Sequence, residues 1–508
     1  MTSATRELFS VDVDPVGLES IVAALSAEFT VATGPKQLIR RIRLDTFDQR
    51  LAAGGITLEH RIAASAERLI LGRPDRSSTV TVPVTDQRWP AFAGSLPEGA
   101  VRDALAPVTG LRALMVTSDE KRRMHRLDLQ NEEGKTVARV ELDEPASRTY
   151  VVPTEVWLLT LRGYDGPARR TARLLAGAGL FAFEPGQDAP RDYLPPVLTA
   201  DSPATTLLSA GLHDFMMAMG SNLPGLLDDV DTEFLHDFRV AVRRTRSVLK
   251  LGRPALPEVF RSRWEPAFKW LGDLTTPVRD LDVYELDLPT MAGWLVATDP
   301  ADLEPFAAHL RARRTAERRS LVRGLRSARF QRLFLEWAEE LYNLGDPADR
   351  DTPDGVDREH RSAGQLADRS ISRAYQRVAR GGAGIRADSP AGDLHALRKR
   401  CKELRYAFEV FAPVIDDGAR KRAVADLKSL QDVLGRFQDT EVQRQALRGF
   451  AEEMLVDGTP AAAVLAMGEL IGHLDAEQDR ARREFDVAFA RFTRPSSQRL
   501  MHRLGGGR

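Results

Sequence analysis

The sequence has too little cysteine for covalent cross-links and no apolar run long enough for a membrane span. Its single cysteine, Cys401, excludes an intramolecular disulfide and a zinc site made of several thiolates. Cys401 lies in a helical stretch, where a small buried core residue is the ordinary interpretation. No run approaches about 18 apolar residues, and the first residues carry no signal-peptide pattern. We therefore expect a cytoplasmic protein without a membrane span.

A large net charge is missing as well. The 508 residues contain 72 Lys and Arg against 73 Asp and Glu, a net charge of −1. This balance gives no general reason to expect a nucleic-acid or membrane partner. Charge is nevertheless uneven, because 309–329 carries eight arginines and one glutamate. Local clusters of this kind permit anion sites without an extreme overall charge.

Two regions of different pattern divide the chain. Residues 1–182 contain short alternating runs separated by Gly, Pro and Asp, which predicts an antiparallel β domain, tunnel-like or barrel-like. Residues 183–203 contain five prolines and read as a linker. From 204 to 500 the pattern is helical almost throughout. The predicted fold class is therefore α+β and multidomain.

The helical region itself falls into two sets. Residues 204–344 form a first repeat, the polar segment 345–357 a hinge, and 358–500 a second repeat. We expect two tandem four-helix bundles related by a pseudo-two-fold axis. The pattern breaks within each set, which predicts separate helices over 258–275 and 278–288, and again over 418–435 and 439–456.

One motif occurs twice at an offset of 159 residues. The first copy is His236, Arg239, Arg243 and Arg246, followed by Asp280 and Val283; the second is His395, Arg398, Lys402 and Arg405, followed by Asp439 and Val442. Only one of the six positions changes, from arginine to lysine. Such a repeat of polar positions points to a duplicated binding surface.

The four cations of each copy share one side of a helix. Positions i, i+3, i+7 and i+10 fall within about 80° of one another at about 100° per residue. A solvated helix face is the alternative explanation. Such a face would usually interleave acids with the cations, and it has no reason to keep His and Arg at identical positions twice. We call these two groups of four residues the basic stripes.

Further residues extend this candidate site. Lys269 and Lys428 also correspond at 159 residues, whereas Arg318 and Arg319 correspond to Arg482 and Arg483 at 164. Asp280 and Asp439 each open a predicted helical run, where an acid can cap the helix or complement its dipole. Alternatively, each Asp orients a residue of the stripe. We expect a structural or orienting role for both.

The repeated motif resembles the CHAD domain, a family named for conserved histidines in an α-helical fold. The stretches at 235–246 and 277–283, and their counterparts at 394–409 and 427–439, carry a resemblance that covers roughly 203–500. The resemblance implies two four-helix bundles that bind inorganic polyphosphate in a basic central groove. It would place both stripes in that groove.

The N-terminal part is similar to the CYTH, or triphosphate tunnel, family over 41–61. That family's first strand reads Glu-x-Glu-x-Lys, whereas only Glu7 matches here and Phe9 and Val11 replace the other two. Trp157 and Leu159 stand where further acids are expected. Candidate tunnel cations remain at Arg41, Arg43, Arg61, Arg126 and Arg139. Without acids to hold a metal, a triphosphate lacks its main charge stabiliser, so we expect a degenerate, catalytically silent domain.

The repeated cations thus predict a duplicated basic surface, and the family resemblance implies that it binds inorganic polyphosphate or a similar linear polyanion. The sequence predicts no catalytic residue, metal or cofactor. A metal-dependent triphosphatase in residues 1–182 is one alternative. An RNA-binding module is another, disfavoured because only Tyr406 offers an aromatic ring beside a stripe. Association with polyphosphate granules, regulation and a scaffolding role all fit the main prediction.

Overall fold

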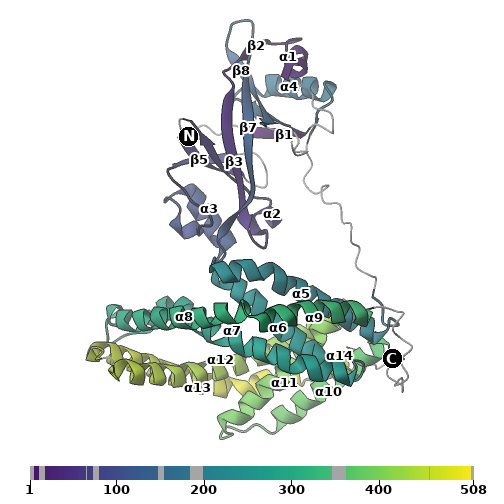
Figure 1. Cartoon of the computed structure of the whole chain (residues 1–508), viewed down its shortest axis with the longest axis vertical. Coiled ribbons are helices and arrows are strands. Elements are labelled where there is room, and N and C mark those ends of the chain that lie inside the picture. The colour runs from purple at the N-terminus through teal and green to yellow at the C-terminus, as the bar shows by residue number, and fades with distance from the viewer. Residues whose placement is uncertain are drawn as a thin grey trace. The chain divides into compact units, whose positions relative to one another are not determined.

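The computed structural model describes residues 5–10, 18–64, 66–72, 79–146, 154–182, 198–345, 362–456 and 458–504 (Figure 1). Two compact units divide the chain, Met1–Leu194 and Pro195–Arg508. The first is a curled antiparallel sheet and the second is helical, so the predicted fold class is confirmed. Residues 183–197 of the predicted linker and 346–357 of the predicted hinge lie outside the described residues.

The N-terminal unit is built on one antiparallel sheet. Its strands are β1 (Thr5–Ser10), β2 (Thr30–Thr33), β3 (Gln37–Thr46), β4 (Thr57–Ala63), β5 (Ala66–Gly72), β6 (Thr79–Val84), β7 (Leu114–Gln130), β8 (Thr136–Pro145), β9 (Glu155–Thr160) and β10 (Phe181–Ala182). Their order is β10-β1-β9-β8-β7-β3-β4-β5-β6, and β2 pairs with β7. Strand β7, with 17 residues, is much longer than the short runs predicted for this part of the chain.

Two small cores fix this sheet. Helices α1 (Leu18–Leu25) and α4 (Asp165–Gly177) pack on β7, β8 and β9 around buried residues such as Leu129 and Val140. Helices α2 (Arg50–Ala53) and α3 (Ala100–Thr109) pack near β3 to β6 around Leu58 and Leu105. These helices cover apolar parts of the sheet, and its remaining face carries the charged side chains described below.

The helical unit contains long helices joined by short turns. They are α5 (Ala204–Asp228), α6 (Thr232–Leu251), α7 (Glu258–Ala292), α8 (Glu304–Leu325), α9 (Ala328–Gly345), α10 (Ala363–Ala383), α11 (Ala391–Val410), α12 (Asp417–Val456), α13 (Ala461–Phe492) and α14 (Pro495–Leu504). The predicted breaks within 258–288 and 418–456 are wrong, because α7 and α12 are each continuous. Pro277 lies inside α7 without ending it.

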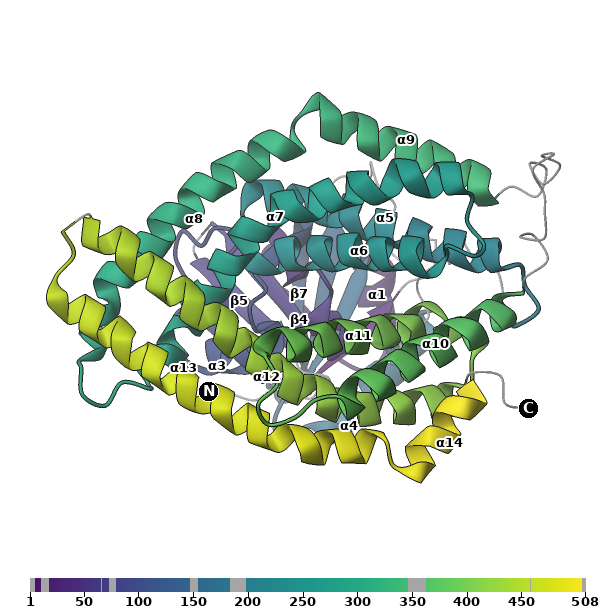
Figure 2. The ribbon, with the colours of Figure 1, turned by 90° about the horizontal axis from the view of Figure 1, so that it is seen from below.

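The two halves of this unit repeat each other at the offset seen in the sequence. α5, α6 and α7 begin at residues 204, 232 and 258, whereas α10, α11 and α12 begin at 363, 391 and 417. The offset is 159 residues in every case. α6 and α11 have the same length, 20 residues. Figure 2 shows these two helices next to each other in the centre of the helical unit.

Two ion pairs between α6 and α11 are arranged about a two-fold axis. Arg244 lies 3.4 Å from Glu409, and Lys250 pairs with Glu403. Arg244 and Glu403 hold the same position of the repeat, as do Lys250 and Glu409. Arg244 therefore faces the residue of α11 that is equivalent to Lys250, and Lys250 faces the residue that is equivalent to Arg244. Two antiparallel helices related by a two-fold axis require this arrangement. Both cations belong to the first half and both acids to the second.

The halves also share a core away from this crossing. Leu281 and Phe306 of the first half lie in one buried cluster with Phe450 and Leu470 of the second. Residues 203 and 362, again equivalent, form an isolated β-bridge at the starts of α5 and α10. The halves are therefore held together at several places, and α6 and α11 are fixed against each other.

Candidate anion-binding surface

The core-facing side of α6 determines where its basic stripe points. Asp231 caps the helix, since its side chain accepts hydrogen bonds from the backbone N–H groups of Glu233 (3.0 Å) and Phe234 (3.3 Å). Phe238 and Val242 are buried in the first half. This packing turns the stripe away from the core, and Arg243 and Arg246 are exposed.

Arg239 is held in place by uncharged groups. Its Nη1 donates to the hydroxyls of Thr276 (2.9 Å) and Thr275 (3.0 Å) and to the carbonyl oxygen of Gly272 (3.3 Å), all on α7. Burial lowers the pKa of Arg239, Asp280 acts in the opposite direction, and Arg243 lowers it further. The guanidinium is thus oriented but not neutralised by an ion pair with any described acid.

The two stripes meet at Arg243 and Lys402, which are equivalent positions of the repeat. The Cζ of Arg243 lies 5.6 Å from the ring centre of Tyr406 on α11. Burial and the charges of Arg398 and Arg243 lower the pKa of Lys402. Cations of both halves therefore repel one another across the axis, which is the electrostatic situation that a bound anion would relieve.

The acids beside the stripes behave differently in the two halves. Asp439 forms an ion pair with Arg398 at 3.0 Å. No such pair joins Asp280 to Arg239 among the described residues, and burial raises the pKa of Asp280. Both acids lie inside continuous helices, so the capping role predicted for them is wrong. Asp439 is placed to orient Arg398.

The two histidines also differ. The Nδ1 of His395 lies 2.6 Å from the side-chain oxygen of Gln438. In the first half the position of Gln438 is taken by Arg279, and burial and the charge of Arg279 lower the pKa of His236. Among the described residues, no group of three or more His, Cys, Asp or Glu side chains is arranged to hold a metal ion.

The remaining predicted cations are distributed unevenly. Arg246 and Lys428 are exposed, with no acid at ion-pair distance in the described part of the chain. Arg405 pairs with Glu409 at 3.0 Å and Lys269 with Asp273 at 2.7 Å. These pairs are exposed and therefore weak, so they still leave both cations available to a stronger anion.

Arg318 and Arg482 have the same structural role in the two halves, because each bonds the segment that precedes a stripe helix. Arg318 donates to the carbonyl oxygen of Leu227 (2.7 Å) and pairs with Asp229 (3.0 Å), just before α6. Arg482 donates to the carbonyl oxygens of Ser389 (2.7 Å) and Ala387 (2.8 Å), just before α11. The structure thus directs both arginines to the loops that begin the stripe helices.

Most arginines of helix α8 likewise form ion pairs with acids of the helical unit. Arg314 pairs with Asp229 at 2.8 Å and with Asp282 at 2.6 Å, and Arg313 pairs with Glu453. Arg319 and its counterpart Arg483 are exposed. Of the eight arginines of 309–329, Arg311, Arg313, Arg314 and Arg318 lie beside an acid, and the other four have no acid at ion-pair distance in the described part of the chain.

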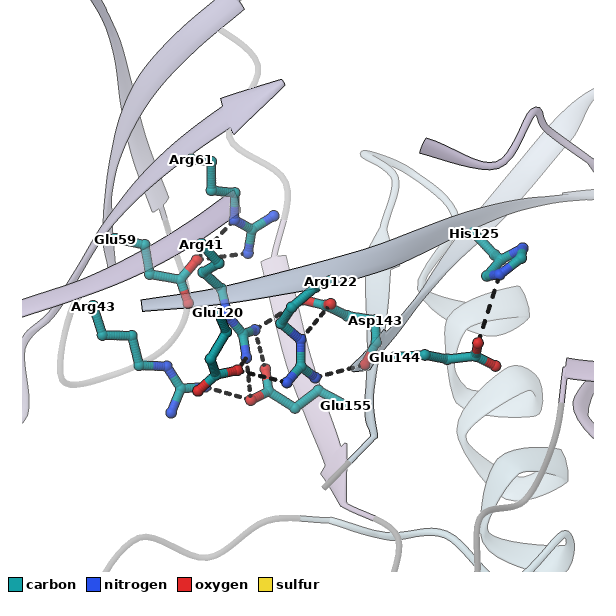
Figure 3. A network of polar contacts seen from close by, with 10 residues as sticks. All are labelled: Arg41, Arg43, Glu59, Arg61, Glu120, Arg122, His125, Asp143, Glu144 and Glu155. Atoms are coloured by element: carbon teal, nitrogen blue, oxygen red, sulfur yellow. Dashed lines mark hydrogen bonds and ion pairs between the residues drawn. The ribbon is translucent and has the colours of Figure 1, made fainter. Parts of the chain in front are cut away.

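A second cluster of charges lies on the inner face of the N-terminal sheet (Figure 3). The side chain of Arg41 is fully buried and bonds Glu155 at 2.7 Å and Asp143 at 2.8 Å. Glu155 also pairs with Arg43, and Arg122 bonds Asp143 at 2.6 Å. Strands β3, β7, β8 and β9 bring these residues together by alternation.

Two further pairs complete the cluster and were not foreseen from the sequence. Arg61 bonds Glu59 at 2.7 Å, and Arg122 bonds Glu120 at 2.8 Å. Arg126 and Arg139, by contrast, share Asp128 outside it. Four acids, Glu59, Glu120, Asp143 and Glu155, thus lie on this face, at positions other than those of the missing signature acids. The strand registers, which set these neighbours, could not be derived from composition.

The fold and the repeated cations define a duplicated all-α domain with a basic surface between its halves. Residues 210–448 match the family model described as the CHAD domain. This match lies within the helical unit and agrees with the resemblance noted in the sequence.

Several solved structures are similar to parts of the chain. The CHAD domain from the plant Ricinus communis is 25% identical and matches over 60% of this chain and 96% of its own, with a TM-score of 0.48. PptA from Streptomyces chartreusis is 19% identical over 57% and 99%, with a TM-score of 0.42. A proposed adenylyl cyclase from Hippeastrum, HpAC1, described as revealing a dominant triphosphatase activity, is 14% identical over 37% and 93%, with a TM-score of 0.26. No curated protein sequence matches. The described helices include none that is long and apolar enough to cross a membrane.

Proposed function

We propose that the helical unit binds a linear polyanion, inorganic polyphosphate in particular, along the stripes of α6 and α11. The observation that carries this proposal is the meeting of Arg239, Arg243 and Lys402 on one surface. Burial and the neighbouring charge of Arg243 lower the pKa values of Arg239 and Lys402. An anion placed between the stripes would remove that repulsion.

The residue types suit phosphate. Arginine presents several N–H donors in a planar fork that matches phosphate oxygens, and charge-assisted hydrogen bonds of this kind are strong. Thr275 and Thr276 already fix the guanidinium of Arg239, so little side-chain entropy is lost when an anion binds. A chain of phosphates can contact both halves at once, which adds many modest contacts.

The test is calorimetry on the full chain with long-chain polyphosphate. By analogy with nucleic acids, affinity should fall steeply between about 50 mM and about 200 mM salt as condensed counterions are released. The double variant Arg239→Glu with Arg398→Glu should bind at least about tenfold more weakly. The matched control, Arg369→Glu with Arg380→Glu on α10, makes the same charge change outside the stripes. Absence of binding at low salt would refute the proposal.

A second candidate function belongs to the N-terminal sheet. Arginines, which suit phosphate, and carboxylates, which can bind a metal, gather on its inner face, although no described group of three or more acids is arranged around one metal position. Against this function, the arginines and carboxylates there are already bonded to one another. Phosphate release from tripolyphosphate with Mg²⁺ or Mn²⁺ tests it. Phosphate release that requires the added metal and is kept in the stripe variant would establish it, and no release with either metal would refute it.

A further inference from the structure

The crossing of α6 and α11 creates the same cavity twice. Two cavities of about 260 Å³ flank it, and Ser247 and Tyr406, which are equivalent positions, line both. The pair of Arg244 and Glu409 lines the first cavity, and the pair of Lys250 and Glu403 lines the second. The two cavities can therefore be compared position by position.

Their walls differ at one bulky residue. Phe215 of α5 lines the first cavity, and its counterpart on α10, which lines the second, is Ala374. We call them the Phe215 cavity and the Ala374 cavity. The Cζ of Arg244 lies 5.9 Å from the ring centre of Phe215, so an aromatic ring and a cation line the first cavity side by side. In the second cavity the equivalent residues are Ala374 and Glu403.

The Ala374 cavity is also the more basic of the two. Arg373 and Arg377 stand where the first half has Asp214 and Ala218. Its cationic lining residues are Lys250, Arg253, Arg373 and Arg377, against one acid, Glu403. The Phe215 cavity has two arginines and one glutamate. The two cavities are thus equal in volume, but the Ala374 cavity is the more positively charged and lacks an aromatic ring at the Phe215 position.

The acids near the Ala374 cavity do not neutralise it. Arg377 lies 2.7 Å from Glu403, which Lys250 shares, and Arg253 pairs with Glu265 at 3.0 Å. No carboxylate lies at ion-pair distance from Arg373 in the described part of the helical unit. Since these cations are exposed, their existing pairs are weak and an incoming anion can displace them.

Most of the remaining wall is apolar. Leu251, Pro254, Ala374 and the ring of Tyr406 line it, together with two serines, Ser247 and Ser370. An inorganic anion alone would leave this surface unused. Ligand pockets usually combine apolar walls with a few placed polar groups and measure about 300–1,000 Å³. At about 260 Å³ this cavity admits one flat ring system, with charged groups outward at its open side.

We propose that the Ala374 cavity binds a small organic phosphate of the nucleoside phosphate class. The flat apolar group lies against Leu251, Pro254 and Tyr406, and the phosphates face Arg373 and Arg377. This site is distinct from the basic stripes, although the ring of Tyr406 also makes a cation–π contact with Arg243 of the first stripe.

The experiment is calorimetry on the full chain with ATP as the probe, and with tripolyphosphate and adenosine as its two parts. ATP should bind more tightly than either part. Arg373→Glu with Arg377→Glu should weaken ATP binding by about tenfold or more, because two charge-assisted contacts become repulsive. Ala374→Phe should also abolish it, by placing in this cavity the ring that its twin contains. The control is Arg369→Glu with Arg380→Glu on the same helix.

Measuring polyphosphate affinity in the same variants distinguishes this site from the basic stripes. Ala374→Phe should leave polyphosphate affinity within about twofold, and Arg239→Glu with Arg398→Glu should leave ATP affinity equally unchanged. The proposal is overturned if tripolyphosphate binds as tightly as ATP. It is likewise overturned if ATP affinity is unchanged when the charges of the exposed Arg373 and Arg377 are reversed. It is also overturned if the stripe variant loses ATP.

Discussion

Arg243 and Lys402 occupy the same position in the two halves of the helical unit, and burial together with the charges of Arg398 and Arg243 lowers the pKa of Lys402. Equivalent positions of a two-fold arrangement approach each other only near the axis. The one position of the motif that changes type, from arginine to lysine, therefore lies where the two basic stripes meet.

A neutral residue at this position should stabilise the empty protein and weaken its binding. Because the folded-state pKa of Lys402 is lowered, the unfolded state binds its proton more readily, so the charged lysine destabilises the fold. This destabilisation is fully present below the lowered pKa and disappears as pH rises towards 10.5. We expect Lys402→Gln to raise the Tm without ligand at pH 7 and to lower polyphosphate affinity. A lower Tm together with unchanged affinity would contradict this account.

The two halves should not contribute equally to binding. Asp439 already pairs with Arg398, whereas Arg239 bonds only to hydroxyl and carbonyl groups. Arg239→Ala should therefore weaken polyphosphate binding more than Arg398→Ala, by a factor that calorimetry can measure. Asp439→Asn should raise affinity and reduce that difference. Equal losses for the two arginine variants would show that Asp439 moves away when the anion binds.

Removing Arg482 should affect stability rather than binding. Its guanidinium donates to two carbonyl oxygens before α11, at 2.7 and 2.8 Å. Charge-assisted bonds contribute about 1.5–3 kcal/mol each, and less where water reaches them, as it does at these exposed and half-buried bonds. We expect Arg482→Ala to lower the free energy of unfolding by about 1–3 kcal/mol in urea, with polyphosphate affinity reduced less than in Arg239→Ala. The opposite order would assign Arg482 to the binding surface.

The helical repeat was accessible from the sequence because both of its signals are local. The spacing of His236 and Arg239 reports one helix face, and the offset to His395 and Arg398 reports the duplication. The helix break predicted near Pro277 was wrong. Tertiary packing keeps α7 continuous through this proline, which would end an isolated helix. Propensity alone does not contain that packing energy.

The charged inner face of the sheet was not accessible in the same way. Arg41 meets Glu155 across more than one hundred residues of chain, and only the strand order brings β3 near β9. The length of β7 was not foreseen because five consecutive charged residues, 119–123, interrupt the alternating apolar pattern of a strand. Pairings that depend on sheet register need the structure.

Glu155→Gln should destabilise the N-terminal unit strongly. It leaves Arg41, which is fully buried, and Arg43 without their shared partner, and breaking a buried pair costs about 3–5 kcal/mol. Burial would raise the pKa of Glu155, but Arg41 and Arg43 lower it below its ordinary value. Its contribution is therefore present above pH 4.5 and lost as pH falls through the lowered pKa. Urea unfolding of wild type and variant at pH 7 and at about pH 3 measures both effects.

Glu469 provides the most specific pH test because it joins the halves through a single carboxylate. It lies on α13 and accepts hydrogen bonds from the backbone N–H groups of Ala297 (2.9 Å) and Thr298 (3.0 Å) in the loop after α7. These bonds, with those from Val296 and the Thr298 hydroxyl, lower its pKa to about 2. Since the folded pKa lies below the ordinary 4.5, the contribution is complete above pH 4.5 and fades as pH falls towards 2. Hydrogen exchange at residues 296–298, corrected for intrinsic rates, should therefore show lower protection at about pH 2 than at pH 5. Glu469→Gln should remove this difference, and a pH dependence that persists in the variant would assign it to another group.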